Sequence, residues 1–225
     1  MQYKIHTAPI WDAFKKDDCL CPLCLINEEL VQGLVDKYLN EAVMVPLSRQ
    51  LVNQYGFCSH HYNMLLKGDN ILGVALQSIT RTEYLQNIIK PPKNIKTAKK
   101  QALELLSQSQ SCVICNEADK TMDRYYMTVA QMFYNEPPFM KALSSCKGFC
   151  LYHYAKLLEN AHYAREKVKL FLECIYSVEI SKLARLRSNL DSFTQKFDYQ
   201  KKELPWGDSK DSPWRASQLI TKRKI

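Results

Sequence analysis

One short pattern occurs twice in this chain and limits the folds that are open to it. A Gly-Phe-Cys-x-x-His-Tyr segment occupies residues 56–62 and again residues 148–154. A Cys-x-x-Cys pair precedes each copy, and the two spacers between pair and segment differ in length by one residue. Such agreement indicates an internal duplication, and the shared residues are of the types that bind metal ions.

The repeated cysteines and histidines predict two metal sites. A Cys-x-x-Cys pair supplies two ligands from one turn, and a Cys-x-x-His pair on the first turn of a helix supplies two more from one face. We predict one site from each Cys-x-x-Cys pair and the segment that follows it in the sequence. Site one is Cys21, Cys24, Cys58 and His61, and site two is Cys112, Cys115, Cys150 and His153.

Three thiolates and one imidazole favour Zn²⁺, so we expect two zinc ions per chain. Protein ligands fill all four positions of each site, which leaves no position for water or substrate, and no catalytic residue is predicted. The alternative is a pair of buried thiol clusters in a helical core that hold no metal.

Four residues of ligand type have no counterpart in the other copy: His60, Cys19, Cys146 and Cys174. We predict that His60 is either solvated or lies beside the first site without binding the metal, with replacement of His61 as the alternative. The three cysteines are predicted core or surface thiols. The alternative is that Cys19 or Cys146, each close to a site in the sequence, exchanges into it or reacts with a substrate.

The fold class follows from apolar residues that recur at three- and four-residue steps and from the presence of only six glycines. The prediction is an all-α protein of two tandem helical repeats with a docked C-terminal helix. The boundaries are a first repeat at 1–90, a linker at 91–100, a second repeat at 101–190 and a tail at 191–225. Helices are predicted over 23–40, 113–134 and 213–222, and one long helix from 150 to about 190.

Composition and sequence pattern restrict the expected cellular location of the protein and the classes of partner it binds. The first residues lack the apolar run of a signal peptide, and paired cysteines are typical metal ligands in a reducing compartment, so we expect a cytoplasmic location. No stretch reaches the roughly 18 to 20 apolar residues of a membrane span. The net charge of +8 is moderate for 225 residues, below the profile of a dedicated nucleic-acid binder.

Three features together resemble an uncharacterised prokaryotic family of unknown function: the Cys21-Pro22-Leu23-Cys24 pair, the two Gly-Phe-Cys segments and the closing Trp214-Arg215-Ala216. The resemblance implies the same duplicated pattern and a presumed ability to bind metal. The second pair, Cys112-Val113-Ile114-Cys115, lacks the proline, which reduces its rigidity and leaves the ligand assignment unchanged.

The leading functional interpretation is a non-enzymatic helical scaffold or interaction protein that binds a protein partner. The second is an iron–sulfur or thiol redox protein that uses the same cysteines. The third and less supported is nucleic-acid binding through two basic runs, Lys90, Lys93, Lys96, Lys99 and Lys100, and Lys222, Arg223 and Lys224. A catalytic role finds no support, because the sequence has no Gly-rich phosphate loop, no His-Glu-x-x-His and no nucleophile elbow.

Overall fold

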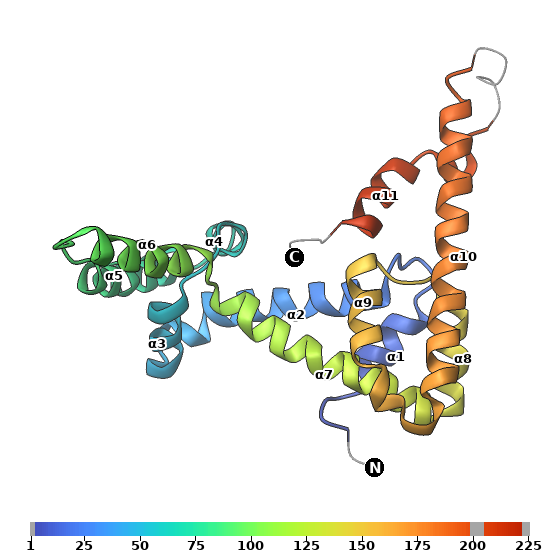
Figure 1. Ribbon diagram of the computed structural model, residues 1–225, viewed down its shortest axis with the longest axis horizontal. Helices are drawn as coiled ribbons and strands as arrows, with labels where there is room; N and C mark the ends of the chain where they lie inside the picture. Colours follow the sequence, from blue (N-terminus) through green and yellow to red (C-terminus); the bar gives the residue numbers. More distant parts are fainter. Residues whose placement is uncertain (1–2, 199–204, 222–225) are drawn as a thin grey trace. The chain divides into compact units, whose positions relative to one another are not determined.

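The computed structural model describes residues 3–198 and 205–221. These residues form eleven α-helices and three short 3-10 helices, with no strand among them, which confirms the all-α prediction (Figure 1). They divide into two compact units: unit 2 is Glu28–Thr121, and unit 1 is the chain up to Asn27 together with the chain from Met122 onward. In the described part of the chain, no helix is apolar enough over a sufficient length to cross a bilayer.

Two long helices, α2 (Pro22–Leu39) and α7 (Val113–Asn135), contribute residues to both units. Each begins directly after the first cysteine of a Cys-x-x-Cys pair. The other elements of unit 2 are η1 (Glu41–Met44), α3 (Pro46–Tyr55), α4 (Ser59–Leu66), α5 (Ile71–Ile88) and α6 (Ile95–Gln110). The predicted linker at 91–100 is therefore helical in its second half.

Local signals set the ends of the unit 2 helices. Pro46 starts α3, since proline tolerates the first helical turn, and Gly56 with φ 62° ends it. The side chain of Asn70 caps α5, and Asn94 forms a capping box at the start of α6. The unit packs around a buried cluster in which Tyr38 and Leu65 are fully enclosed.

Unit 1 holds the remaining elements: α1 (Ala8–Lys15), α8 (Pro137–Ser145), α9 (Leu151–Glu159), η2 (Ala161–Lys167), α10 (Val168–Gln195), η3 (Gly207–Ser209) and α11 (Ser212–Ile220). Its core is rich in phenylalanine. The rings of Phe14 and Phe139 lie 5.1 Å apart, and those of Phe133 and Phe171 lie 5.2 Å apart. Helix α11 packs against α10 and α9, which confirms the docked C-terminal helix (Figure 1); residue 222, the predicted end of that helix, lies outside the described residues.

The predicted unbroken helix from 150 to about 190 is wrong. The chain leaves the α-helix at Asn160, passes through η2 and resumes as α10. Arg165 adopts a left-handed φ of 49°, and Ala161 and Ala164 are buried against the rest of the unit. Residues 149–204 contain no glycine or proline. Tertiary packing rather than a local breaker therefore sets this interruption.

Candidate metal centres

All eight predicted ligands lie in two clusters, but the predicted pairing is wrong. One cluster joins Cys21 and Cys24 to Cys150 and His153, and the other joins Cys58 and His61 to Cys112 and Cys115. Each Cys-x-x-Cys pair thus meets the Cys-x-x-His pair of the other motif copy. We call the first group cluster 1, which lies in unit 1, and the second cluster 2, which lies in unit 2.

The length of α2 explains the exchange. An 18-residue helix is about 27 Å long, whereas the ten residues of α3 span only about 15 Å. The chain that leaves Cys24 along α2 therefore does not return to it before Cys58. Instead, the backbone N–H of Val113 donates to the carbonyl of Gly56 at 2.9 Å, and the Ser111 hydroxyl donates to the carbonyl of Tyr55 at 2.6 Å. These bonds hold the second Cys-x-x-Cys pair beside the first Gly-Phe-Cys turn.

Each ligand pair occupies the first turn of a helix. Cys58 and Cys150 are the N-cap residues of α4 and α9, with nearly identical backbone angles, φ −71°, ψ 163° and φ −74°, ψ 157°. Cys21 and Cys112 stand directly before α2 and α7. Two helix N-termini therefore meet at each cluster, and their partial positive charges favour thiolates there.

Cluster 1 is buried and converges on one imidazole nitrogen. The sulfurs of Cys21, Cys24 and Cys150 lie 3.4, 3.3 and 3.2 Å from Nδ1 of His153. The sulfurs of Cys24 and Cys150 lie 3.6 Å apart. The ring of Tyr126 packs near that of His153, with centroids 5.9 Å apart.

Cluster 2 repeats this arrangement with two half-buried members, Cys58 and Cys115. The sulfurs of Cys58, Cys112 and Cys115 lie 3.3, 3.3 and 3.4 Å from Nδ1 of His61. The sulfurs of Cys58 and Cys115 lie 3.9 Å apart. In both clusters the four donor atoms lie within 4.8 Å of one another.

These distances fit four ligands around a single tetrahedral ion. With bonds of about 2.3 Å to sulfur and about 2.0–2.1 Å to nitrogen, the tetrahedron edges are roughly 3.8 Å between sulfurs and roughly 3.6 Å between sulfur and nitrogen. The observed sulfur–sulfur separations of 3.6 and 3.9 Å and sulfur–nitrogen separations of about 3.3 Å lie close to these values. In each ring Nδ1 faces the three sulfurs, so it is the atom placed to bind the ion. The Nε2 atoms of His61 and His153 are buried and have no hydrogen-bond partner among the described residues.

The sulfurs of a cluster cannot all be thiolates without a cation. Hydrogen bonds from Cys21 and Cys24 lower the pKa of the Cys150 thiol well below its usual range, whereas burial raises that of Cys21. In cluster 2, the hydrogen bond from Cys115 lowers the pKa of the Cys112 thiol to about 3. The same hydrogen bond raises the pKa of the Cys115 thiol. Like charges this close oppose one another's ionisation, and a divalent ion removes that opposition.

The glycine of each Gly-Phe-Cys turn is required by its backbone. Gly148 has φ 105°, and a Cβ there would lie 2.4 Å from Cδ of Lys182. Gly56 has φ 62°, and a Cβ there would lie 3.0 Å from Nε of Arg81. In both motif copies a cationic side chain from the following long helix covers this turn. Any other residue in place of the glycine would displace that cationic side chain.

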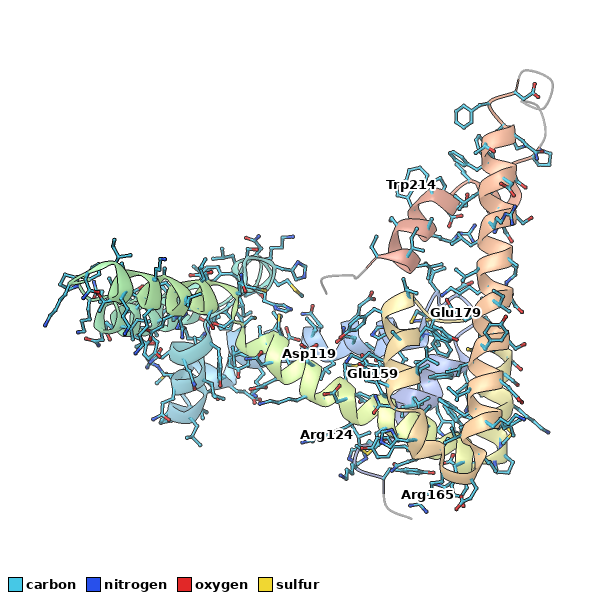
Figure 2. The ribbon with its side chains drawn as sticks, in the orientation of Figure 1. Asp119, Arg124, Glu159, Arg165, Glu179 and Trp214 are labelled. Carbon is cyan, nitrogen blue, oxygen red and sulfur yellow. The ribbon has the colours of Figure 1, made fainter. Side chains whose placement is uncertain are left out.

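Two buried charges that the sequence analysis missed hold the turn of cluster 1. Glu179 and Lys182 on α10 are 6% and 5% exposed. The backbone N–H of Phe149 donates to Oε2 of Glu179 at 2.9 Å, and Nζ of Lys182 donates to the carbonyl of Phe149. Figure 2 shows Glu179 between α10 and α9. Their signal in the sequence is the spacing Ile175, Val178, Glu179, Lys182, Leu186, which places both charges on the buried face of α10.

Replacing Lys182 by Met is expected to lower the free energy of unfolding by about 2 kcal/mol, because the buried carbonyl of Phe149 would lose the charged donor that Nζ of Lys182 supplies. Urea unfolding of the metal-loaded protein measures the change. The matched control is Lys169→Met on the same helix, where the side chain is 92% exposed and the change should stay within about 0.5 kcal/mol. Equal losses in the two variants would show that the clamp on Phe149 does not contribute to stability.

The remaining residues of ligand type stay outside both clusters. His61, not His60, enters cluster 2, and none of Cys19, Cys146 and Cys174 enters a cluster in the described chain. Burial raises the pKa of Cys146 to about 11, so this thiol is protonated at neutral pH. Phe14 packs beside the turn of cluster 1, with its ring centroid 6.2 Å from that of Phe149.

The family of the chain follows from a comparison with family models. The model of the family of unknown function DUF6062 matches residues 1–225. The chain belongs to DUF6062. This agrees with the resemblance carried by the paired cysteines and Gly-Phe-Cys segments. No curated protein and no solved structure matched this DUF6062 chain.

Proposed function

We propose that this DUF6062 protein is a non-enzymatic zinc protein, in which two structural Cys₃His sites stabilise a helical scaffold that binds a protein partner. The observation that carries the proposal is the convergence of three sulfurs and one Nδ1 within 4.8 Å at each cluster. Protein atoms supply all four positions of the tetrahedron, as in structural rather than catalytic zinc sites.

The size of the clusters supports a single ion over an iron–sulfur cluster. An iron–sulfur cluster places several irons and sulfides between its cysteine ligands, so those ligands lie farther apart than ligands that share one ion. The sulfur pair Cys24 and Cys150, at 3.6 Å, leaves room for one ion only. Zinc suits a tetrahedral set of thiolates and imidazole, and it has no redox chemistry of its own.

The exposed face of α6 supports a role in binding a protein. This helix has no buried residue, and Ile95, Leu103 and Leu106 are 77%, 70% and 57% exposed. Their spacing places them near one face of the helix. Apolar side chains gathered on a surface helix are typical of protein-interaction surfaces.

Protein purified without oxygen from cells supplied with both zinc and iron is expected to contain two zinc ions per chain and no visible absorption band. Elemental analysis and an absorption spectrum of the same sample measure this. A Cys19→Ser, Cys146→Ser, Cys174→Ser variant, which retains all eight cluster residues, serves as the control and should hold the same metal. Stoichiometric iron with a visible band would favour the redox function instead.

A further inference from the structure

Unit 2 contains a cavity of about 280 Å³ that neither cluster uses. Its walls come from α3, α4, α5 and α6 and from the turn at Gly56 and Phe57, directly before Cys58. Counted at about 30 Å³ per molecule of liquid water, its volume equals that of roughly nine waters. The space therefore suits a compound of amino-acid size.

Two amide oxygens in the walls have no partner among the described residues. Gln77 is 1% exposed, and its Nε2 donates to the carbonyls of Tyr38 and Gly73 at 2.9 and 3.3 Å, which leaves Oε1 unpaired. Oε1 of Gln108, on the facing helix α6, is also buried and unpaired. An unpaired buried acceptor costs about 1–3 kcal/mol, so a ligand that donates to both oxygens would recover this cost.

Arg81 gives the cavity a positive charge that the described chain does not neutralise. Its guanidinium donates to the carbonyl of Asn53 at 2.5 Å and lies 5.5 Å from the ring of Tyr84. No described carboxylate lies within ion-pair distance of it, unlike Arg215, which pairs with Asp211. A guanidinium has several N–H donors in a planar fork, which suits a carboxylate.

We infer that this cavity binds a small carboxylate that also carries N–H donors, with the chemistry of an α-amino acid or of the C-terminal residue of a peptide. The carboxylate pairs with Arg81, and the N–H groups donate to Gln77 and Gln108. Tyr55, Phe57 and Tyr62 supply aromatic walls for the side chain of the ligand. The inference does not depend on which metal fills the clusters.

Thermal-shift measurements on the full-length, metal-loaded protein test this inference, with the standard amino acids supplied one at a time. At least one is expected to raise Tm in a saturable way, and its C-terminal carboxamide is not. Tripeptides Gly-Gly-X, one for each standard residue X, distinguish the two sources. If a tripeptide binds and its free C-terminal amino acid does not, the carboxylate belongs to a peptide terminus. No binding by any amino acid or tripeptide, or equal binding of the carboxamide, would overturn the inference.

A substitution on α5 gives a sharper control. Leu85 lines the cavity one helical turn beyond Arg81, at i, i+4 spacing. Leu85→Glu should supply Arg81 with a carboxylate from the chain itself and bind the ligand roughly tenfold or more weakly than Leu85→Gln, which has the same shape and no charge. Titration calorimetry measures both affinities, and equal affinities would exclude Arg81 as the anion site.

Discussion

Replacing Cys21 and Cys150 together by Ser is expected to remove one of two bound metal ions, whereas replacing Cys21 and Cys58 together is expected to remove both. Cys21 and Cys150 are ligands of the same cluster, so replacing both destroys only that site. Cys21 and Cys58 are ligands of different clusters, so replacing both destroys the two sites. Elemental analysis after dialysis against a moderate chelator measures the stoichiometry.

This comparison also decides between the two possible pairings. Pairing along the sequence predicts the reverse result, with both ions lost from Cys21→Ser/Cys150→Ser and one ion lost from Cys21→Ser/Cys58→Ser. A Cys19→Ser/Cys146→Ser double variant controls for the loss of two thiols, since neither residue enters a cluster. That reverse result would refute the exchanged arrangement.

The pairing could not be predicted from the sequence, because the motif carries no information on which copy its partner comes from. Two copies of one pattern offer two equivalent Cys-x-x-His pairs to each Cys-x-x-Cys pair. The choice depends on where α2 takes the chain and on backbone bonds such as Val113 to Gly56. Both are features of the tertiary structure, and proximity in the sequence did not predict them.

Local chemistry, by contrast, was predictable. Apolar periodicity predicted 23–40 and 113–134, and the structure has helices at Pro22–Leu39 and Val113–Asn135. Pro46 and Gly56 mark the ends of α3, since one fixes φ and the other permits a positive φ. The break between α9 and α10 had no such signal, because residues 149–204 contain no glycine or proline.

The polar residues around cluster 1 and in the cavity of unit 2 could not be predicted either, for a different reason. Glu179 and Lys182 are a turn apart in a helix where charged residues are common, and only their place on the buried face distinguishes them. The unpaired oxygens of Gln77 and Gln108 belong to side chains of α5 and α6 that line the same cavity. No spacing in the sequence brings those two side chains together.

Removing both metal ions with a strong chelator is expected to abolish the cooperative thermal unfolding transition, and adding zinc is expected to restore it. Structural zinc contributes roughly 10–16 kcal/mol per site in small peptides, whereas whole domains are stable by about 5–15 kcal/mol. Cluster 1 joins residues that are 126 positions apart in the sequence. Near-UV circular dichroism, which reports tyrosine and tryptophan packing, should lose its signal together with the transition.

Loss of a single ion should act on one unit, because each cluster lies within one. In Cys21→Ser/Cys150→Ser, hydrogen exchange is expected to accelerate in peptides from Val168–Gln195 and to remain slow in peptides from Pro46–Tyr55. Cys58→Ser/Cys112→Ser should give the opposite pattern, and each variant serves as the control for the other. Acceleration throughout the chain in both variants would mean that the units fold as one cooperative body and that neither cluster stabilises its own unit alone.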